Sequence, residues 1–146
     1  CSSWGGIFAA PPNPTAVQSV ATATGKTTIN IPGCPPHPDW IVWAIAQLVA
    51  GQSIPTDSYG RPTAIFQRRV HERCPLRFAD ETHRWGNENL CKEDLGCRGK
   101  RDQCRAPCPE QFFNAGENWC IGAGSLCIGC VDPAFPGTSA FFKDAE

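Results

Sequence analysis

The cysteines constrain this chain more than any other feature of its sequence. There are ten of them among 146 residues, and eight lie between Cys74 and Cys130. The chain also has 14 Gly and 14 Pro, which suits loops arranged around something other than ordinary side chains. Because the net charge is only −1, no strong field favours nucleic acid or a membrane surface. Two sources of order fit such a chain: bound metal, or disulfides, of which ten cysteines allow up to five.

The first third of the chain has the pattern of an α/β protein. Residues 27–31 form a short β-branched run that predicts a strand. A turn containing Cys34 follows, and we expect Asp39 to be the N-cap of a helix. Apolar residues then recur at helical spacing on one face: Ile41, Ala44, Ile45, Leu48 and Val49. Cys34 is thus expected in a loop at the carboxyl end of a strand, where α/β sheets bind ligands; the alternative is a buried structural cysteine.

The pattern changes near residue 60. Residues 51–62 form a linker with Pro and Gly, and the apolar periodicity fades beyond it. We therefore expect two domains, residues 1–60 with α/β character and residues 61–146 with little regular secondary structure. The second is too poor in periodic apolar residues to bury a large core, so metal or disulfides must organise it. No run approaches the roughly 20 apolar residues of a membrane-spanning helix.

One set of potential ligands combines a histidine with three cysteines. His71 and Cys74 are three residues apart, so in a helical turn they share one face. Cys91 and Cys97 follow at a separation of five residues. One imidazole and three thiolates could hold a structural zinc or an iron–sulfur cluster. The alternative is a surface histidine near a cysteine that is merely buried.

A second set contains four cysteines: Cys108, Cys120, Cys127 and Cys130. Cys127 and Cys130 form a C-x-x-C motif, which by itself is shared by zinc ribbons and thioredoxin-like redox sites. The glycines beside this motif leave backbone N–H groups free to point at the sulfurs, an arrangement that tunes cluster potentials.

Three cysteines remain outside these sets. Cys1 and Cys34 form a pair, and two ligands cannot complete a site for four. Either they form a disulfide, or their two partners lie in sequence before Cys1; a chain that starts at Cys1 and contains no Met indicates a piece of something longer. Cys104 is only four residues before Cys108, and either could in principle join the second set.

Ordered motifs along the whole chain resemble the small subunit of nickel–iron hydrogenases. The matching segments are Cys-Ser-Ser-Trp-Gly-Gly-Ile at 1–7, Asn-Pro-Thr at 13–15, Ile-Asn-Ile-Pro-Gly-Cys-Pro-Pro-His-Pro-Asp-Trp at 29–40, Gly-Arg-Pro at 60–62, Val-His-Glu-Arg-Cys-Pro at 70–75, Leu-Gly-Cys-Arg-Gly at 95–99, Cys-Pro at 108–109 and Cys-Ile-Gly-Cys-Val-Asp-Pro at 127–133. The resemblance covers the later part of such a subunit. It implies an α/β fold in which residues 1–60 are the remainder of a flavodoxin-like domain, followed by a loop-rich domain organised by iron–sulfur clusters.

Carried over residue by residue, the resemblance implies three clusters. Cys1 and Cys34 match the later two ligands of a proximal [4Fe–4S] cluster whose first two ligands precede Cys1. The distal [4Fe–4S] cluster is matched by His71, Cys74, Cys91 and Cys97. The medial cluster is matched by Cys108, Cys127 and Cys130. Many members have Pro where this chain has Cys120 and hold a medial [3Fe–4S] cluster, so Cys120 implies [4Fe–4S] here, with [3Fe–4S] as the alternative. Cys104 is then expected to be a free thiol.

The function implied is electron transfer within a [NiFe] hydrogenase, an oxidoreductase that interconverts H₂ with protons and electrons. The Ni–Fe catalytic site belongs to a separate large subunit, so this chain holds no catalytic residue. The other partner implied is a redox protein such as a cytochrome near the distal cluster, and heterodimers could assemble further. Two other classes stay open: a stand-alone ferredoxin-like carrier and a disulfide-rich secreted protein. The compartment is open too, periplasmic or cytoplasmic, for a soluble or peripherally attached protein.

Two surfaces follow from this assignment. Residues 1–40 are expected to face the large subunit, with Trp4, Trp40 and Trp43 as apolar anchors or, alternatively, as core residues. Ten of the 13 Lys and Arg lie between Arg68 and Arg105. They are expected either to steer an acidic electron acceptor or to form an ordinary mixed-charge face.

Overall fold

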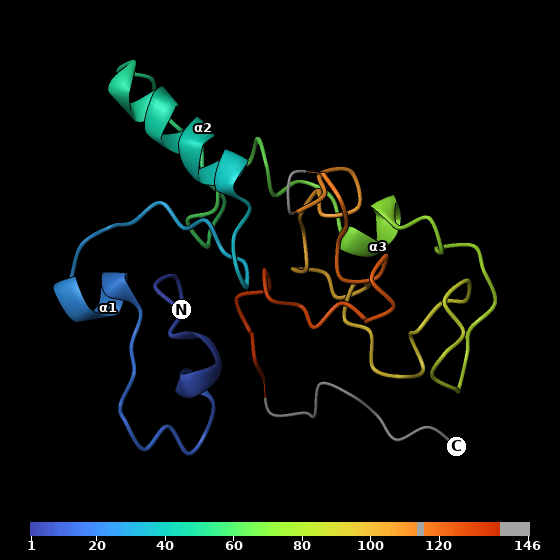
Figure 1. Ribbon diagram of the computed structural model, residues 1–146. Coiled ribbons are helices and arrows are strands. Elements are labelled where there is room, and N and C mark those ends of the chain that lie inside the picture. Colours follow the sequence, from blue (N-terminus) through green and yellow to red (C-terminus); the bar gives the residue numbers. More distant parts are fainter. Residues whose placement is uncertain (114–115, 138–146) are drawn as a thin grey trace.

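Helices make up a small part of this protein (Figure 1). The computed structural model describes residues 1–113 and 116–137. Its helical elements are a 3-10 turn, η1 (Gly6–Ala9), and three α-helices, α1 (Val20–Thr24), α2 (Pro38–Val49) and α3 (Val70–Arg73). The residues described form no β-sheet, and isolated bridges such as the one between Arg69 and Arg105 are the strand-like pairings. No helix within these ranges is long and apolar enough to cross a bilayer.

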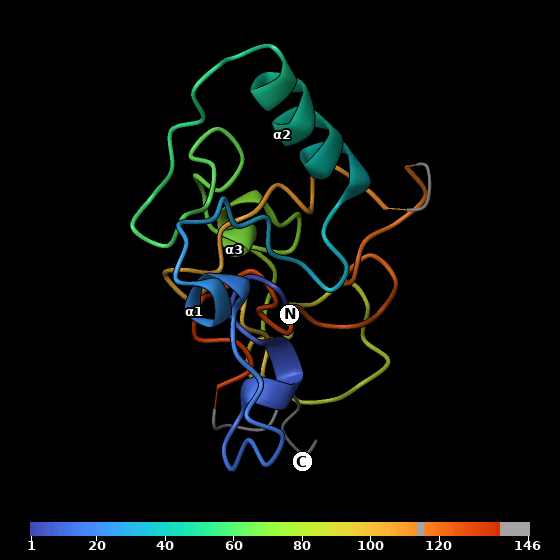
Figure 2. The ribbon, with the colours of Figure 1, turned by 90° about the vertical axis from the view of Figure 1, so that its left-hand side faces the viewer.

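The long loops beyond residue 60 confirm the expectation of little regular secondary structure. Between residues 61 and 137, α3 is the one helix that the described chain contains. It spans a single turn, and its Glu72 carboxylate accepts from the backbone N–H of Arg69 at 2.9 Å, which closes the start of the turn. The segments around α3 fold over one another without forming layers (Figures 1 and 2).

Helix α2 forms where the periodicity predicts it but begins differently. The N-cap is His37, whose Nδ1 accepts from the Asp39 backbone N–H at 3.2 Å. Pro38 occupies the first turn, where its missing N–H costs nothing. The prediction of Asp39 as N-cap is therefore wrong, because the imidazole supplies the acceptor and Asp39 lies within the first turn, where its charge favours the helix dipole.

The predicted apolar face of α2 is mostly not buried by this chain. Trp40 and Ala44 pack inward, whereas Ile45 and Leu48 are 55% and 54% exposed. The helix projects from the body of the molecule, which leaves this side uncovered (Figures 1 and 2). Trp40 itself is 3% exposed, so its predicted role as an interface anchor is wrong; Trp4 and Trp43 are half-buried.

The strand predicted at residues 27–31 does not form in the described chain. The Asn30 backbone N–H donates to the Gly60 carbonyl at 2.8 Å, and its side-chain amide donates to the Tyr59 carbonyl at 2.8 Å. Two hydrogen bonds anchor the segment, but a strand needs a neighbour that continues the ladder, and none of the described segments provides one.

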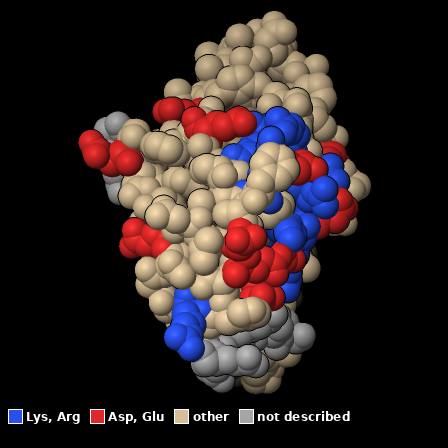
Figure 3. Space-filling model, turned by 90° about the vertical axis from the view of Figure 1, so that its right-hand side faces the viewer, with Lys and Arg blue, Asp and Glu red and all other residues tan. Residues whose placement is uncertain are grey.

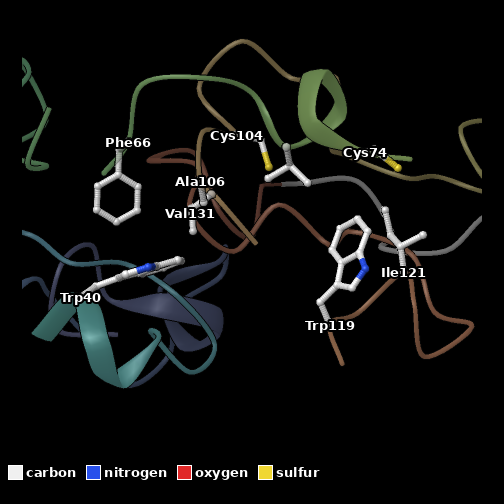
Figure 4. Packing of buried hydrophobic residues seen from close by; sticks show 9 residues of the cluster. Trp40, Phe66, Cys74, Cys104, Ala106, Trp119, Ile121 and Val131 are labelled. Atoms are coloured by element: carbon white, nitrogen blue, oxygen red, sulfur yellow. The ribbon is translucent and has the colours of Figure 1, made fainter. Parts of the chain in front are cut away.

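The core joins α2 to the loops after residue 60 (Figure 4). Trp40 packs edge-on against Phe66, with ring centroids 5.5 Å apart. The cluster is completed by Val70, Cys74, Cys104, Ala106, Trp119, Ile121 and Val131. Four further cysteines pack against its margin: Cys97, Cys108, Cys127 and Cys130. The core therefore has thiols as well as aliphatic side chains at its edge, and the candidate sites lie around it.

Arg61 ties the linker to these loops. The side chain is 1% exposed, and its guanidinium donates to Asp57 Oδ2 at 2.8 Å. It also donates to the backbone carbonyls of Gln103 and Val131, at 2.7 and 3.0 Å. A buried charge needs such a complete set of partners. Arg61 thereby holds the 57–61 turn against the segments that carry Cys104 and Cys130.

Candidate metal centres

The first candidate site is a small cavity beside α3. It is lined by all four residues of the predicted distal set, His71, Cys74, Cys91 and Cys97, together with Lys92, Gly99 and apolar side chains. Helix α3 carries His71 and ends at Cys74, whose backbone N–H donates to the His71 carbonyl at 3.1 Å. The structure therefore brings together residues that are 26 positions apart, from 71 to 97.

Backbone contacts fix the remaining distal residues. The Cys91 backbone N–H donates to the Asp80 carbonyl at 2.8 Å, and the Cys97 N–H donates to the Lys92 carbonyl at 3.1 Å. The Cys97 sulfur also accepts hydrogen bonds, from the backbone N–H groups of Gly99 and Cys127. Donors directed at a cysteine sulfur stabilise the thiolate and orient it as a ligand.

Burial controls the ionisation of this set. It lowers the pKa of His71, and the nearby cations Lys100, Arg69 and Arg77 lower it further, so the imidazole is neutral and able to coordinate iron. Burial raises the pKa of the Cys97 thiol to about 11. A thiol held this way loses its proton when a metal binds, because the metal supplies the positive charge that the site lacks.

Lys92 gives an independent indication that an anion belongs in this cavity. The residue is 3% exposed, and its Nζ has no hydrogen-bond partner within the described chain. An unpaired buried ammonium is costly, and buried charges in proteins are normally paired. A cluster bound by three thiolates carries negative charge, so the residues present fit such a group.

The second site is a cavity of about 60 Å³ around Cys1 and Cys34. Gly6 approaches so closely that a Cβ there would collide with Cys1 Sγ, so only glycine, at φ +67°, fits this cradle. Both cysteines are exposed in this chain. Cys34 lies in the loop just before α2, as predicted, but the strand expected to precede that loop does not form in the described chain.

Cys130 lines the same cavity, although the sequence assigns it to the medial set. Its thiol donates a hydrogen bond to Cys34, which lowers the pKa of Cys34 to about 6. Donating this hydrogen bond and being buried both raise the pKa of Cys130. Cys130 therefore stands between the first cysteine pair and the remaining thiols.

The medial set gathers around Cys127. Its negative charge raises the pKa of Cys108 and Cys120, in each case after the larger effect of burial. The Gly129 N–H donates to the Cys127 sulfur, as expected from the glycines of this motif. Gly129 has φ +76°, and a Cβ there would lie 3.1 Å from Arg98 Cβ, so glycine allows the loop to turn back on its own cysteine.

Cys104 is the residue whose place the sequence does not reveal. It is fully buried, and its Sγ lies 3.6 Å from Cys127 Sγ. The hydrogen bond to Cys127 is the largest cause of its raised pKa, and the same bond lowers the pKa of Cys127; with Cys127 ionised, as a ligand would be, the Cys104 thiol is the donor. Its short spacing from Cys108 was the signal in the sequence, but spacing alone does not tell a ligand from a donor.

All ten cysteines are free thiols in the structure. The 3.6 Å between Cys104 and Cys127 is far from the about 2.05 Å of a disulfide. Among the residues described, no three His, Cys, Asp or Glu side chains are close enough to hold a single metal ion. The candidate sites are thus cavities lined by thiols, and their side chains are not arranged as the four ligands of a single tetrahedral ion.

Two family models match the chain. The model for the C-terminal region of the NiFe/NiFeSe hydrogenase small subunit matches residues 66–143. The model for the 20 kDa subunit of NADH ubiquinone oxidoreductase matches residues 1–48.

Relatives with curated names support the same family. The periplasmic [NiFeSe] hydrogenase small subunit of Desulfomicrobium baculatum is 38% identical over all of this chain and 50% of its own length. The F420 non-reducing hydrogenase II small subunit of Methanosarcina mazei is 35% identical over 100% of this chain and 45% of its own. The chain spans about half the length of these relatives.

Solved structures agree. The [NiFeSe] hydrogenase of Desulfovibrio vulgaris Hildenborough has a chain with TM-score 0.85 and 36% identity, covering 98% of this chain and 57% of that one. A chain of the actinobacterial-type NiFe-hydrogenase of Ralstonia eutropha H16 also has TM-score 0.85, at 31% identity, covering 100% of this chain and 46% of that one. On the family model and these likenesses together, the chain belongs to the NiFe/NiFeSe hydrogenase small subunit family.

Proposed function

We propose that this chain conducts electrons between a Ni–Fe site on a large subunit and an external redox partner. The observation that carries the proposal is the position of the segment 127–130. Cys130 lines the same cavity as Cys34, and the Cys127 carbonyl accepts from the backbone N–H of Arg98, the residue after Cys97, at 2.7 Å. One short loop therefore lies beside the proximal pair at one end and beside the distal set at the other, which is the connectivity a relay needs.

Each group of neighbouring thiols is assigned to one of three clusters. Cys1 and Cys34 would hold part of a proximal [4Fe–4S] cluster, completed by ligands outside this chain. A medial [4Fe–4S] cluster would be held by Cys108, Cys120, Cys127 and Cys130, with [3Fe–4S] as the alternative. A distal [4Fe–4S] cluster would be held by His71, Cys74, Cys91 and Cys97. When bound, the clusters supply the one-electron chemistry, while the protein fixes their positions and tunes them.

The division into domains is part of the same proposal. Residues 1–60 would be the end of a flavodoxin-like domain, and residues 61–146 the medial and distal cluster domain. Different family models match residues 1–48 and 66–143, on either side of the proposed boundary. The exposed apolar side of α2 supports further protein packing there, because Ile45 and Leu48 would otherwise remain in water.

The large subunit is the partner proposed for the proximal side. Cys1 and Cys34 are exposed in this chain, although a cluster between them would have to be sheltered from solvent. The half-buried Trp4 lines their cavity and remains a candidate anchor at that interface. A higher assembly of such heterodimers stays compatible with this arrangement.

The electron acceptor or donor is proposed to dock near the distal cavity. The surface in Figure 3 has Lys and Arg side chains interleaved with Asp and Glu. Within the basic window, Arg69 pairs with Glu72, Arg105 with Asp102, and Lys100 with Glu81 and Glu93. These pairs favour the mixed-charge alternative, so we expect docking to depend only weakly on salt.

The two other classes fit less well. Five disulfides are incompatible with ten free thiols. A stand-alone ferredoxin-like carrier would need its own four ligands at each cluster, whereas the cavity around Cys1 and Cys34 offers these two, with Cys130 already in contact with the set around Cys127.

The test uses the native protein that contains this chain, purified with the chain that accompanies it. We expect a nickel-containing partner, iron and acid-labile sulfide in the amount of three clusters, and reduction of a viologen dye under H₂. Absence of iron and sulfide would overturn the proposal. Clusters without a nickel-containing partner would instead favour the stand-alone carrier.

A further inference from the structure

Lys92 combines burial, positive charge and the absence of a partner. Its residue surface is 3% exposed, and Nζ makes no hydrogen bond within the described chain. Arg73 is the other side chain with an unsatisfied buried nitrogen, but its guanidinium pairs with Glu110 through Nη1. The charge of Arg73 is thus compensated and that of Lys92 is not, so Lys92 needs an anion that the described chain does not provide.

The position of Lys92 indicates which anion this is. It follows Cys91 directly, and its carbonyl accepts the backbone N–H of Cys97 at 3.1 Å. The residue lines the cavity formed by the predicted distal ligands. Cys74 and Cys91 line the same cavity, so the charge of Lys92 lies beside two of the sulfurs that the distal set supplies.

A second lysine near the cavity behaves differently. Lys100 is exposed and forms ion pairs with Glu93 and with Glu81, the latter at 3.5 Å. Its charge is both solvated and neutralised, and salt would screen what remains. Lys92 is shielded from water, so its field inside the cavity is stronger.

We propose that Lys92 is a positioning residue of the distal site that donates a hydrogen bond from Nζ to a sulfur of the bound cluster and raises its reduction potential. The inference rests on the proposed function, since it requires a cluster in this cavity. One electron enters or leaves, and no covalent bond forms or breaks. The reduced form has one more negative charge, so the ammonium stabilises it more than the oxidised form.

Lys92 and His71 act in the same direction. His71 coordinates as a neutral imidazole in place of a thiolate and so removes one negative charge from the ligand set. Lys92 adds a positive charge beside the same set. Together they would raise the potential of the distal cluster above that of a cluster held by four thiolates with no buried cation beside it.

The experiment compares Lys92→Met with Lys100→Met in the complete enzyme with its large subunit. Met keeps the length of the lysine stem without the charge. We expect Lys92→Met to lower the distal potential so that the equilibrium constant for reduction falls at least tenfold, which is 59 mV for one electron. For Lys100→Met, the change in the logarithm of that equilibrium constant should be less than half of the change for Lys92→Met. The readout is an EPR-monitored redox titration at low and high salt, where the Lys92 effect should persist.

A second measurement needs no variant and covers the case in which Lys92→Met fails to assemble. Wild-type enzyme with ¹⁵N-labelled lysine is examined by hyperfine spectroscopy of the reduced distal cluster, where a hydrogen bond from Nζ should give a ¹⁵N coupling. No coupling, or an unchanged potential in a fully loaded Lys92→Met enzyme, would overturn the inference. Because iron and sulfide content are measured on the same samples, missing clusters in wild type would count against the proposed function instead.

Discussion

Helix α2 and the loop around Cys91 and Cys97 differ in what orders them. The helix has a regular apolar pattern and a defined N-cap, yet much of its apolar side faces solvent, with Leu48 54% exposed. The loop has no periodicity at all, yet Cys91 is buried and Lys92 is 3% exposed. The apolar pattern thus predicts that α2 is a helix but not what packs against it. The loop, in contrast, is buried although its sequence has no such pattern.

The comparison teaches where stability must come from in each region. Short-range hydrogen bonds keep α2 helical, but its burial depends on protein beyond the described chain. The loops converge on thiols and on an unpaired ammonium, groups that are poor sources of stability until a metal cluster binds them. We therefore expect the two regions to respond oppositely when iron is withdrawn or when an apolar residue of α2 is changed.

The largest effect is expected from Cys97→Ala. It removes one ligand from the distal site and the sulfur that accepts N–H groups from Gly99 and Cys127. The iron of one whole cluster should be lost, and amide exchange should quicken across residues 70–104 while α2 keeps its protection. Iron analysis and hydrogen-exchange mass spectrometry on the complete enzyme measure both.

The matched control is Leu48→Ala on the exposed side of α2, which should leave the iron content unchanged. Equal loss of protection in α2 and in the loops of the Cys97→Ala enzyme would show that the two regions share one source of order.

The next largest effect concerns Trp40, which packs α2 against the loops after residue 60. It packs against Phe66 at 5.5 Å between ring centroids and donates from Nε1 to Gln111. Trp40→Ala should lower the free energy of unfolding by about 3–5 kcal/mol, because a large buried ring leaves a cavity. Trp43→Ala, at a half-buried position of the same helix, should cost clearly less. Denaturant titration of the intact complex decides, and similar losses for both variants would contradict the assignment of Trp40 to the core.

Residue type and spacing are enough to predict which residues gather at the distal cavity, while their role as ligands stays a prediction. His71, Cys74, Cys91 and Cys97 are predicted as one set and line one cavity. Helix α2 was predictable within two residues of its start, since apolar periodicity marks its extent. The missing strand at 27–31 was not, because strand formation depends on a partner segment rather than on the run itself.

Lys92 and Cys104 could not be placed by sequence reasoning. Lysine is normally solvated, so nothing local distinguishes Lys92 from an exposed residue. Cys104 differs from Cys108 only in its neighbours, and the 3.6 Å contact with Cys127 arises from packing of distant segments. The sequence predicts Cys104 as a free thiol but not its contact with Cys127, and it does not single out Lys92, because both positions are set by the segments packed around them rather than by spacing along the chain.

A smaller change is expected at Cys120, and it sharpens the comparison within the loop region. Cys120→Pro removes the proposed fourth medial thiolate while the other three stay in place. A single iron should leave the cube, and the oxidised enzyme should gain the paramagnetic signal of a [3Fe–4S] cluster. Cys120→Ala removes the same sulfur without constraining the backbone and should give the same signal. A strong three-iron signal already present in undamaged wild type would contradict the [4Fe–4S] assignment.

The smallest effect is expected at Cys104. Its thiol donates to Cys127, so Cys104→Ala should keep the iron content but remove one hydrogen bond to a medial sulfur. The added electron is then less stabilised, and the medial potential should fall. Cys104→Ser retains a donor at the same place and should recover most of the potential, which a purely space-filling role would not. Loss of a cluster's iron in either variant would instead make Cys104 a ligand and exchange its role with Cys108.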